Sequence, residues 1–253
     1  MPRVDDCRTR FGPNKYAALH LLLSRWLRNY AKGACYHYVT LGGTELKDCQ
    51  SLHFIDPGLT TSLVSFESAS DRHQYAVATA KQLDPLGIGV TTRKGDIFDF
   101  TRESEGPHLF FFDFTGTCTH ADLIVKFGRL FADGRLREND ALFVTSYLGR
   151  NLGWTRVLGA FDAEFRIIGV SDFEKKKLSY RRAHPSFTLF RALCSSNMQA
   201  DLLLRCFGCV EYRDSSKMGV YGYVLEKGMT DFPDFIKNAP YFDVEHGFLQ
   251  ASG

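Results

Sequence analysis

The chain has 253 residues and a formal net charge of +2, from 31 Lys and Arg against 29 Asp and Glu. Its 44% apolar and 24% charged residues exclude a disordered, collagenous or repeat-built chain, and the charge balance excludes a polycation. This length is sufficient for one large domain with a sizeable core. No linker or repeat divides the sequence, so we expect one domain over 1–253, with a helix over 14–32, an insertion at about 165–185 and a tail over 229–253.

The sequence carries no sign of export or of membrane insertion. Its start, MPRVDDCRTRFGPNKY, lacks the apolar core of a signal peptide, and no apolar run approaches the roughly 18 residues that span a bilayer. The seven cysteines are odd in number and scattered, which is typical of reduced thiols. We therefore expect a cytoplasmic protein that enters no membrane.

Strand and helix patterns alternate along the first 150 residues. They predict strands over residues 35–41, 63–66, 88–92, 108–112 and 141–146, and helices over 14–32, 70–83 and 121–131. The strands are apolar throughout rather than alternating, which is typical of a parallel sheet that helices cover on both faces. The fold class is therefore predicted to be α/β.

The second part of the chain is less regular. Its patterns predict a helix over 154–161, a short strand or insertion over 166–170, a long helix over 185–204, and two strands over 210–212 and 219–225. The two strands form a hairpin, so the last strand runs antiparallel to its neighbour. We therefore expect a mostly parallel sheet with an antiparallel C-terminal hairpin, and a tail that packs over the surface.

Glycines follow the first predicted strand, at the end where an open parallel sheet binds its ligands. Gly42 and Gly43 let the backbone approach a ligand closely, and Thr44 continues the loop. The second strand ends at Glu67, followed by Ser68. An acid at this position accepts hydrogen bonds from two ribose hydroxyls in dinucleotide-binding sheets. The first two strand ends therefore suit a nucleoside ligand.

Acids also follow the third and fourth predicted strands. Asp96 suits the amino group of an adenine, and the neighbouring Ile97 suits the face of its ring. Asp113 follows the most apolar strand of the chain. Each of these residues also has a structural interpretation, as a solvated strand end or the cap of a turn.

The motifs YVTLGG, LVSFE, GDIFDF and LFFFDFTG, with the closing MGVYGYVLEK, resemble the class I S-adenosylmethionine-dependent methyltransferases over about residues 36–227. The resemblance implies a Rossmann-like sheet and S-adenosylmethionine as cofactor. It places the glycine loop at the amino-acid part, Glu67 at the ribose and Asp96 at the adenine. It also places Asp113 near the transferred methyl group, where this acid orients an acceptor beside Thr115 and Tyr147. The leading helix, NKYAALHLLLSRWL, is also similar to three-Cys-motif partner proteins.

The chain departs from this family in its loops. Gly42 and Gly43 replace a longer GxGxG-like run, and the sequence DFTG at 113–116 lacks the prolines of enzymes that methylate exocyclic base nitrogens. No Pro-Cys pair stands where a cytosine-C5 enzyme carries its nucleophile. A catalytically silent methyltransferase-like domain that binds a protein partner or a nucleotide therefore stays open beside the enzyme.

One basic stretch suits a polyanion. Five cations, Lys175, Lys176, Lys177, Arg181 and Arg182, surround Tyr180 within eight residues. Cations interleaved with an aromatic ring suit a phosphate backbone, so nucleic acid is a candidate partner and acceptor. The alternative is a solvated loop that Asp172 and Glu174 balance.

Two further sets of residues have structural interpretations. His37 and His108 lie in predicted strands and are expected to be hydrogen-bonded core histidines rather than bases. Cys206 and Cys209 have the spacing of zinc ligands, but no second pair matches them, so we expect two buried thiols at a helix end.

Overall fold

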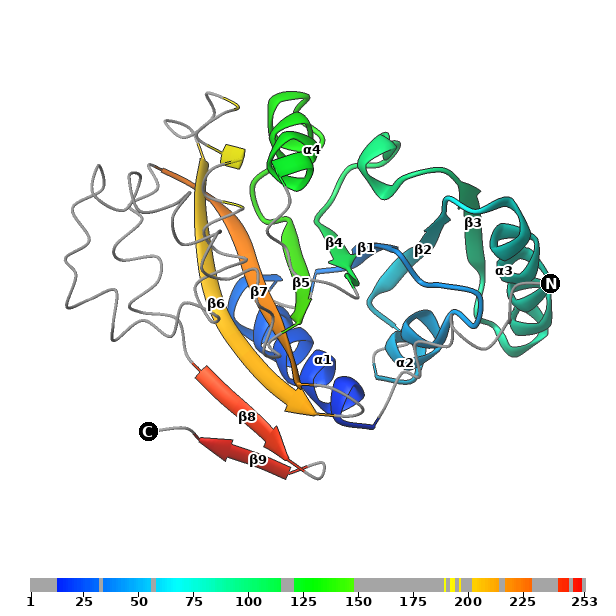
Figure 1. Ribbon diagram of the computed structural model, residues 1–253, viewed down its shortest axis with the longest axis horizontal. Coiled ribbons are helices and arrows are strands. Elements are labelled where there is room, and N and C mark those ends of the chain that lie inside the picture. The colour runs from blue at the N-terminus through cyan, green and yellow to red at the C-terminus, as the bar shows by residue number, and fades with distance from the viewer. Residues whose placement is uncertain are drawn as a thin grey trace.

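The chain is built on one sheet, which Figure 1 shows in the computed structural model with helices on both of its sides. The structure describes residues 13–31, 34–55, 58–114, 121–147, 189, 192–193, 196, 202–213, 217–228, 241–245 and 248–251. In these residues the strands lie in the order β3-β2-β1-β4-β5-β7-β6-β8-β9. No helix among them is both long and apolar enough to cross a membrane.

Five parallel strands form the first half of the sheet: β1 (Tyr36–Thr40), β2 (Thr60–Glu67), β3 (Val90–Lys94), β4 (His108–Phe112) and β5 (Ala141–Tyr147). Next to them, β7 (Lys217–Lys227) runs antiparallel to both β5 and β6 (Leu202–Arg213). The predicted fold class, a mostly parallel α/β sheet with an antiparallel C-terminal hairpin, is therefore confirmed.

Helices cover both faces of this sheet. One face packs against α1 (Pro13–Trp26), α2 (Lys47–Ile55) and α3 (Ser70–Leu83), and the other against α4 (Ala121–Ala132). A π-helical segment, η2 (Leu27–Ala31), continues α1, so that the predicted helix over 14–32 runs to Ala31 in the described residues. Its predicted apolar face is buried at Leu19, Leu22, Leu23 and Trp26, which recur at helical spacing.

The predicted helix over 185–204 is wrong at its C-terminal end, because β6 begins at Leu202. Burial alternates from Leu202 to Cys206, with every second residue buried, which is the period of a strand. The short apolar run LLL fits a helix and a strand equally well, so the sequence pattern did not separate the two. Residues Cys206 to Gly208 therefore lie inside a strand and end no helix.

A register shift in β6 sorts the side chains around Phe207 onto the two faces. Cys206 and Cys209 lie in the core on the α4 face, whereas Phe207 packs on the α1 face. Gly222 on β7 makes room for this ring, because a Cβ there would approach the Phe207 side chain to 2.7 Å. Burial raises the pKa of the free Cys206 thiol to about 12, and no cluster of metal-ligating side chains occurs among the described residues.

The tail over 229–253 was expected to pack over the surface, but its described residues extend the sheet instead. β8 (Tyr241–Glu245) pairs in parallel with β6, and β9 (Phe248–Ala251) pairs antiparallel with β8 (Figure 1). The elements predicted over 154–161 and 166–170, and the insertion at about 165–185, lie outside the described residues.

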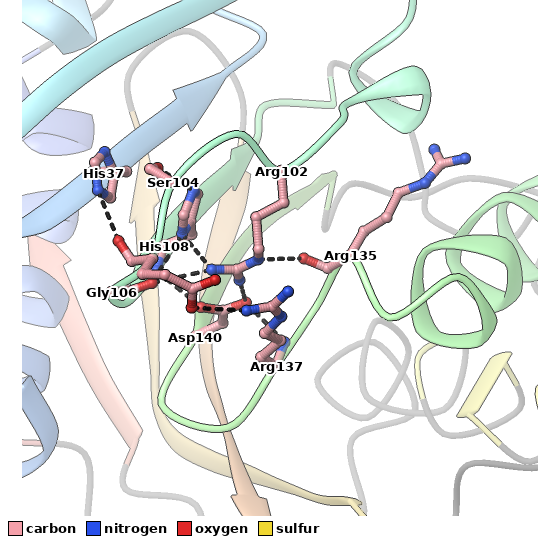
Figure 2. A network of polar contacts seen from close by, with 9 residues as sticks. His37, Arg102, Ser104, Gly106, His108, Arg135, Arg137 and Asp140 are labelled. Carbon is pink, nitrogen blue, oxygen red and sulfur yellow. Dashed lines mark hydrogen bonds and ion pairs between the residues drawn. The ribbon is translucent and has the colours of Figure 1, made fainter.

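A polar network closes the amino-terminal edge of the central strands (Figure 2). Arg102 donates to the carboxylate of buried Asp140 and, at 2.7 Å, to Nδ1 of His108. Asp140 also accepts the backbone N–H of His108 at 2.8 Å, and the His108 ring stacks on His37 at 4.7 Å between centroids. As predicted, both histidines are hydrogen-bonded residues of the sheet. They lie at the edge opposite to the strand ends that carry the candidate site.

The neutral form of His108 is expected to stabilise the fold in a pH-dependent way. Burial, assisted by the positive charge of Arg102, lowers the pKa of His108 from 6.5 to about 4. Because folding lowers this pKa, the stabilisation is complete above pH 6.5 and is lost as the pH falls toward 4. Between pH 7 and pH 4, we expect the free energy of unfolding to fall less in His108→Gln than in the wild type, by at most about 3 kcal/mol. Urea unfolding of both proteins at the two pH values measures it, and equal losses would contradict it.

Candidate functional site

The carboxyl ends of β1 to β5 meet at one edge of the sheet because these strands are parallel. The strand order reverses between β1 and β4, since β1 pairs with β2 on one side and with β4 on the other. Open α/β sheets bind ligands outside the strand ends at this switch point. Gly42 follows β1 and Asp113 follows β4, so the two residues flank it.

The glycine loop needs both of its glycines. Gly43 has a φ of +60°, in the left-handed region that disfavours side chains. A Cβ at Gly42 would lie 2.8 Å from Ser65 Oγ and 3.1 Å from Asp48 Oδ1. The Thr44 carbonyl accepts a hydrogen bond from Thr79 Oγ1 of α3 at 2.8 Å. Side chains of β2 and α2 therefore pack against Gly42, and α3 is hydrogen-bonded to the loop at Thr44.

A buried polar cluster supports this loop and was not predicted. Asp48 Oδ2 accepts hydrogen bonds from Thr40 Oγ1 at 2.5 Å and from the Tyr38 hydroxyl at 2.9 Å. Burial raises the pKa of Asp48, and the charge of Asp113 raises it further, against the hydrogen bonds from Thr40 and Tyr38. Asp48 Oδ1 and Ser65 Oγ have no hydrogen-bond partner in the described part of the chain.

The end of β2 places Glu67 at the same edge. Its Oε1 accepts the backbone N–H of Ala69 at 3.1 Å, which orients the carboxylate. The Glu67 carbonyl accepts the N–H of Gly95 at 3.1 Å, so the residue also ties β2 to the turn that follows β3. Ser68, the next residue, is exposed. Glu67 is therefore both oriented and partly accessible.

Asp96 begins the turn after β3 as the N-cap of η4 (Ile97–Asp99). Its Oδ1 accepts the N–H of Phe98 at 3.2 Å, and its Oδ2 lies 2.5 Å from Lys126 Nζ of α4. The turn directs Ile97 into the core on the α4 face, where it has no exposed surface. The structure thus brings Asp96 to the edge, but the buried side chain of Ile97 is not available to cover an adenine ring.

The Asp113 carboxylate is engaged at both oxygens. Oδ2 lies 2.5 Å from Lys15 Nζ, and Oδ1 lies 3.1 Å from Thr145 Oγ1 of β5, whose single hydroxyl proton Asp113 shares with the Phe114 carbonyl at 2.9 Å. Thr115 and the side chain of Tyr147, its predicted neighbours, lie outside the described residues. In the part that is described, the contacts of the carboxylate are with Lys15 and Thr145.

Sequence reasoning missed Lys15, although one signal marks it. Lys15 lies four residues before Leu19 and seven before Leu22, in line with the buried face of α1. A lysine on the apolar face of a helix is rarely buried without a partner. Its partner, however, is 98 residues away along the chain, so only the packing of α1 identifies it.

Comparison with known proteins finds resemblance among solved structures alone, since no family model and no curated protein matches the chain. The mitomycin 7-O-methyltransferase MmcR is 14% identical over 83% of this chain and 53% of that chain, with a TM-score of 0.45. The plantazolicin methyltransferase BpumL, in complex with SAH, is 11% identical over 84% of each chain, with a TM-score of 0.47. Geranyl diphosphate methyltransferase, in complex with SAM, is 12% identical over 82% of this chain and 84% of that chain, with a TM-score of 0.44.

Gly42→Ala is expected to destabilise the fold by about 1–3 kcal/mol, because the new methyl group overpacks the space against Ser65 and Asp48. Ser65→Ala removes one of the two polar atoms in this space, and its buried hydroxyl has no partner among the described residues. The double variant Gly42→Ala/Ser65→Ala should therefore recover part of the loss. Urea denaturation of the single and double variants measures both effects, and a fully stable Gly42→Ala would refute the close fit.

Proposed function

We propose that this chain is an S-adenosylmethionine-dependent methyltransferase. The observation that carries the proposal is the meeting, at one sheet edge, of a glycine loop and three acids on successive strands. Gly42 follows β1, Glu67 ends β2, Asp96 follows β3 and Asp113 follows β4. This is the set of strand ends through which the chain resembles the class I enzymes.

The described residues fit this cofactor at three of its parts. Gly42 and Gly43 carry no Cβ, and Gly42 packs closely against Ser65 and Asp48, so the backbone of this loop would be open to close approach by the amino-acid part. The Glu67 carboxylate is oriented by the N–H of Ala69 and retains lone pairs that would accept hydrogen bonds from ribose hydroxyls. Asp96 is partly exposed, and its carboxylate oxygens retain lone pairs for an adenine amino group. Burial of Ile97 means that another side chain must cover the adenine ring.

When bound, S-adenosylmethionine supplies a methyl group that is already reactive because it is attached to a sulfonium, so the protein contributes mainly alignment. Asp113 lies on the other side of the switch point from Glu67, where an acceptor would be aligned. Its two oxygens are held by Lys15 and Thr145. We propose that Asp113 orients an acceptor from this fixed position.

A second candidate function is a catalytically silent domain that binds a nucleotide or a protein partner. The ion pair of Asp113 with Lys15 favours it, because Lys15 already occupies an oxygen of the carboxylate that would orient an acceptor. The two candidates differ in what the glycine loop binds. A methyltransferase should bind S-adenosylhomocysteine much more tightly than adenosine, whereas a nucleotide-binding module should bind the two with similar affinity.

Glu67→Ala is expected to weaken the binding of S-adenosylhomocysteine on the order of a hundredfold or more. The reason is the loss of two hydrogen bonds to a charged acceptor, each worth about 1.5–3 kcal/mol. Isothermal calorimetry measures the affinity, and Glu103→Ala, which removes an acid from an exposed ion pair with Arg93, is the matched control. A wild-type protein that does not bind S-adenosylhomocysteine at millimolar concentration would refute the methyltransferase.

We also propose that the basic stretch from Lys175 to Arg182, which lies outside the described residues, binds nucleic acid. Replacing Lys175, Lys176 and Lys177 with Ala should weaken binding of any sequence by a similar factor and reduce the salt dependence by about three charges. Titration of labelled RNA and DNA at two salt concentrations measures this. Equal binding by the wild type and the triple variant would leave the stretch as a solvated loop.

A further inference from the structure

We infer that Lys15 is a further residue of the ligand site, where it sets the charge that the switch point presents to a ligand. The inference deepens the proposed function, since it concerns how the site distinguishes the methylated cofactor from its demethylated product. These two molecules differ in one charge. The sulfur of S-adenosylmethionine is a cationic sulfonium, and the sulfur of S-adenosylhomocysteine is a neutral thioether.

Lys15 reaches the site from the first turn of α1. Its Nζ lies 2.5 Å from Asp113 Oδ2, and the side chains of Lys15 and Asp113 are only 7% and 15% exposed. The same ammonium lies 5.8 Å from the centroid of the Phe111 ring in β4. An ammonium buried to this degree is stable when an opposite charge is within contact distance. The pair therefore fixes α1 over the end of β4.

The burial of this pair distinguishes it from the ion pair of Asp96 with Lys126 at the same edge. Asp96 and Lys126 are 35% and 42% exposed, so that water and salt screen their charges. The charges of Lys15 and Asp113 are far less exposed, and a ligand at the switch point feels them through a medium of low dielectric constant. Consistent with this, the charge of Asp113 contributes to the raised pKa of Asp48 below the glycine loop.

The pair as a whole carries no net charge, so it favours neither form of the cofactor strongly. Without the ammonium of Lys15, the uncompensated negative charge of Asp113 would attract the sulfonium and leave the thioether unaffected. Without the carboxylate of Asp113, the ammonium of Lys15 would repel the sulfonium. The two single substitutions are therefore expected to move the preference between the two ligands in opposite directions.

The test measures the dissociation constants of S-adenosylmethionine and S-adenosylhomocysteine by calorimetry. Relative to the wild type, Lys15→Met should shift the ratio of the two constants roughly tenfold in favour of S-adenosylmethionine. Asp113→Asn should shift the ratio by a similar factor in favour of S-adenosylhomocysteine. The double variant should return to the wild-type ratio, and Lys15→Arg should keep it. Lys227→Met removes the same charge from an exposed pair with Glu138 at the opposite sheet edge, and should leave the ratio unchanged.

The ratio of the two dissociation constants responds to charge. A general loss of structure would weaken the binding of both ligands equally and leave the ratio unchanged. If every variant keeps the wild-type ratio while binding both ligands, the inference is wrong and the proposed function stands. If the wild type binds neither ligand, both are wrong. If Lys15→Met does not fold, Asp113→Asn decides by itself, because a ratio that is unchanged or shifted toward S-adenosylmethionine overturns the inference.

Discussion

The structure depends on the burial of β4, which lies between β1 and β5 with all five of its residues shielded from water. A strand buried on both faces can carry polar groups only at its ends, and those groups must be paired there. An ion pair closes each end: Arg102 with Asp140 at the amino-terminal end, and Lys15 with Asp113 at the carboxyl end. Each pair fixes a segment from elsewhere in the chain against this strand.

The two ends have different consequences for the molecule. At the amino-terminal end, the network around Asp140 joins the segment before β4 to the turn before β5 and stacks two histidine rings in the sheet (Figure 2). At the carboxyl end, the pair lies at the switch point, beside the glycine loop. The first pair therefore supports the scaffold, and the second belongs to the edge at which parallel sheets bind ligands.

Elements with one long periodic pattern could be predicted from sequence, and short ambiguous runs could not. The run His108–Phe112 was predicted as a strand with both of its bounds, because it is rich in Phe and continues the alternation of strands and helices before it. The run Leu202–Leu204 satisfies a helix and a strand alike, and pairing with β7 selects the strand. The same dependence on partners explains β8 and β9, which form because β6 offers an edge to the tail.

By itself, the sequence determined the fold class and the positions of Gly42, Glu67, Asp96 and Asp113 at one edge, because parallel strands necessarily bring their carboxyl ends together. Only the tertiary structure decided what surrounds these residues. It buried Ile97, placed Asp48 below the glycine loop and brought Lys15 to Asp113. The physical reason is that strand ends follow from local patterns, whereas a buried charge and its partner are selected by the packing of segments that lie far apart in the chain.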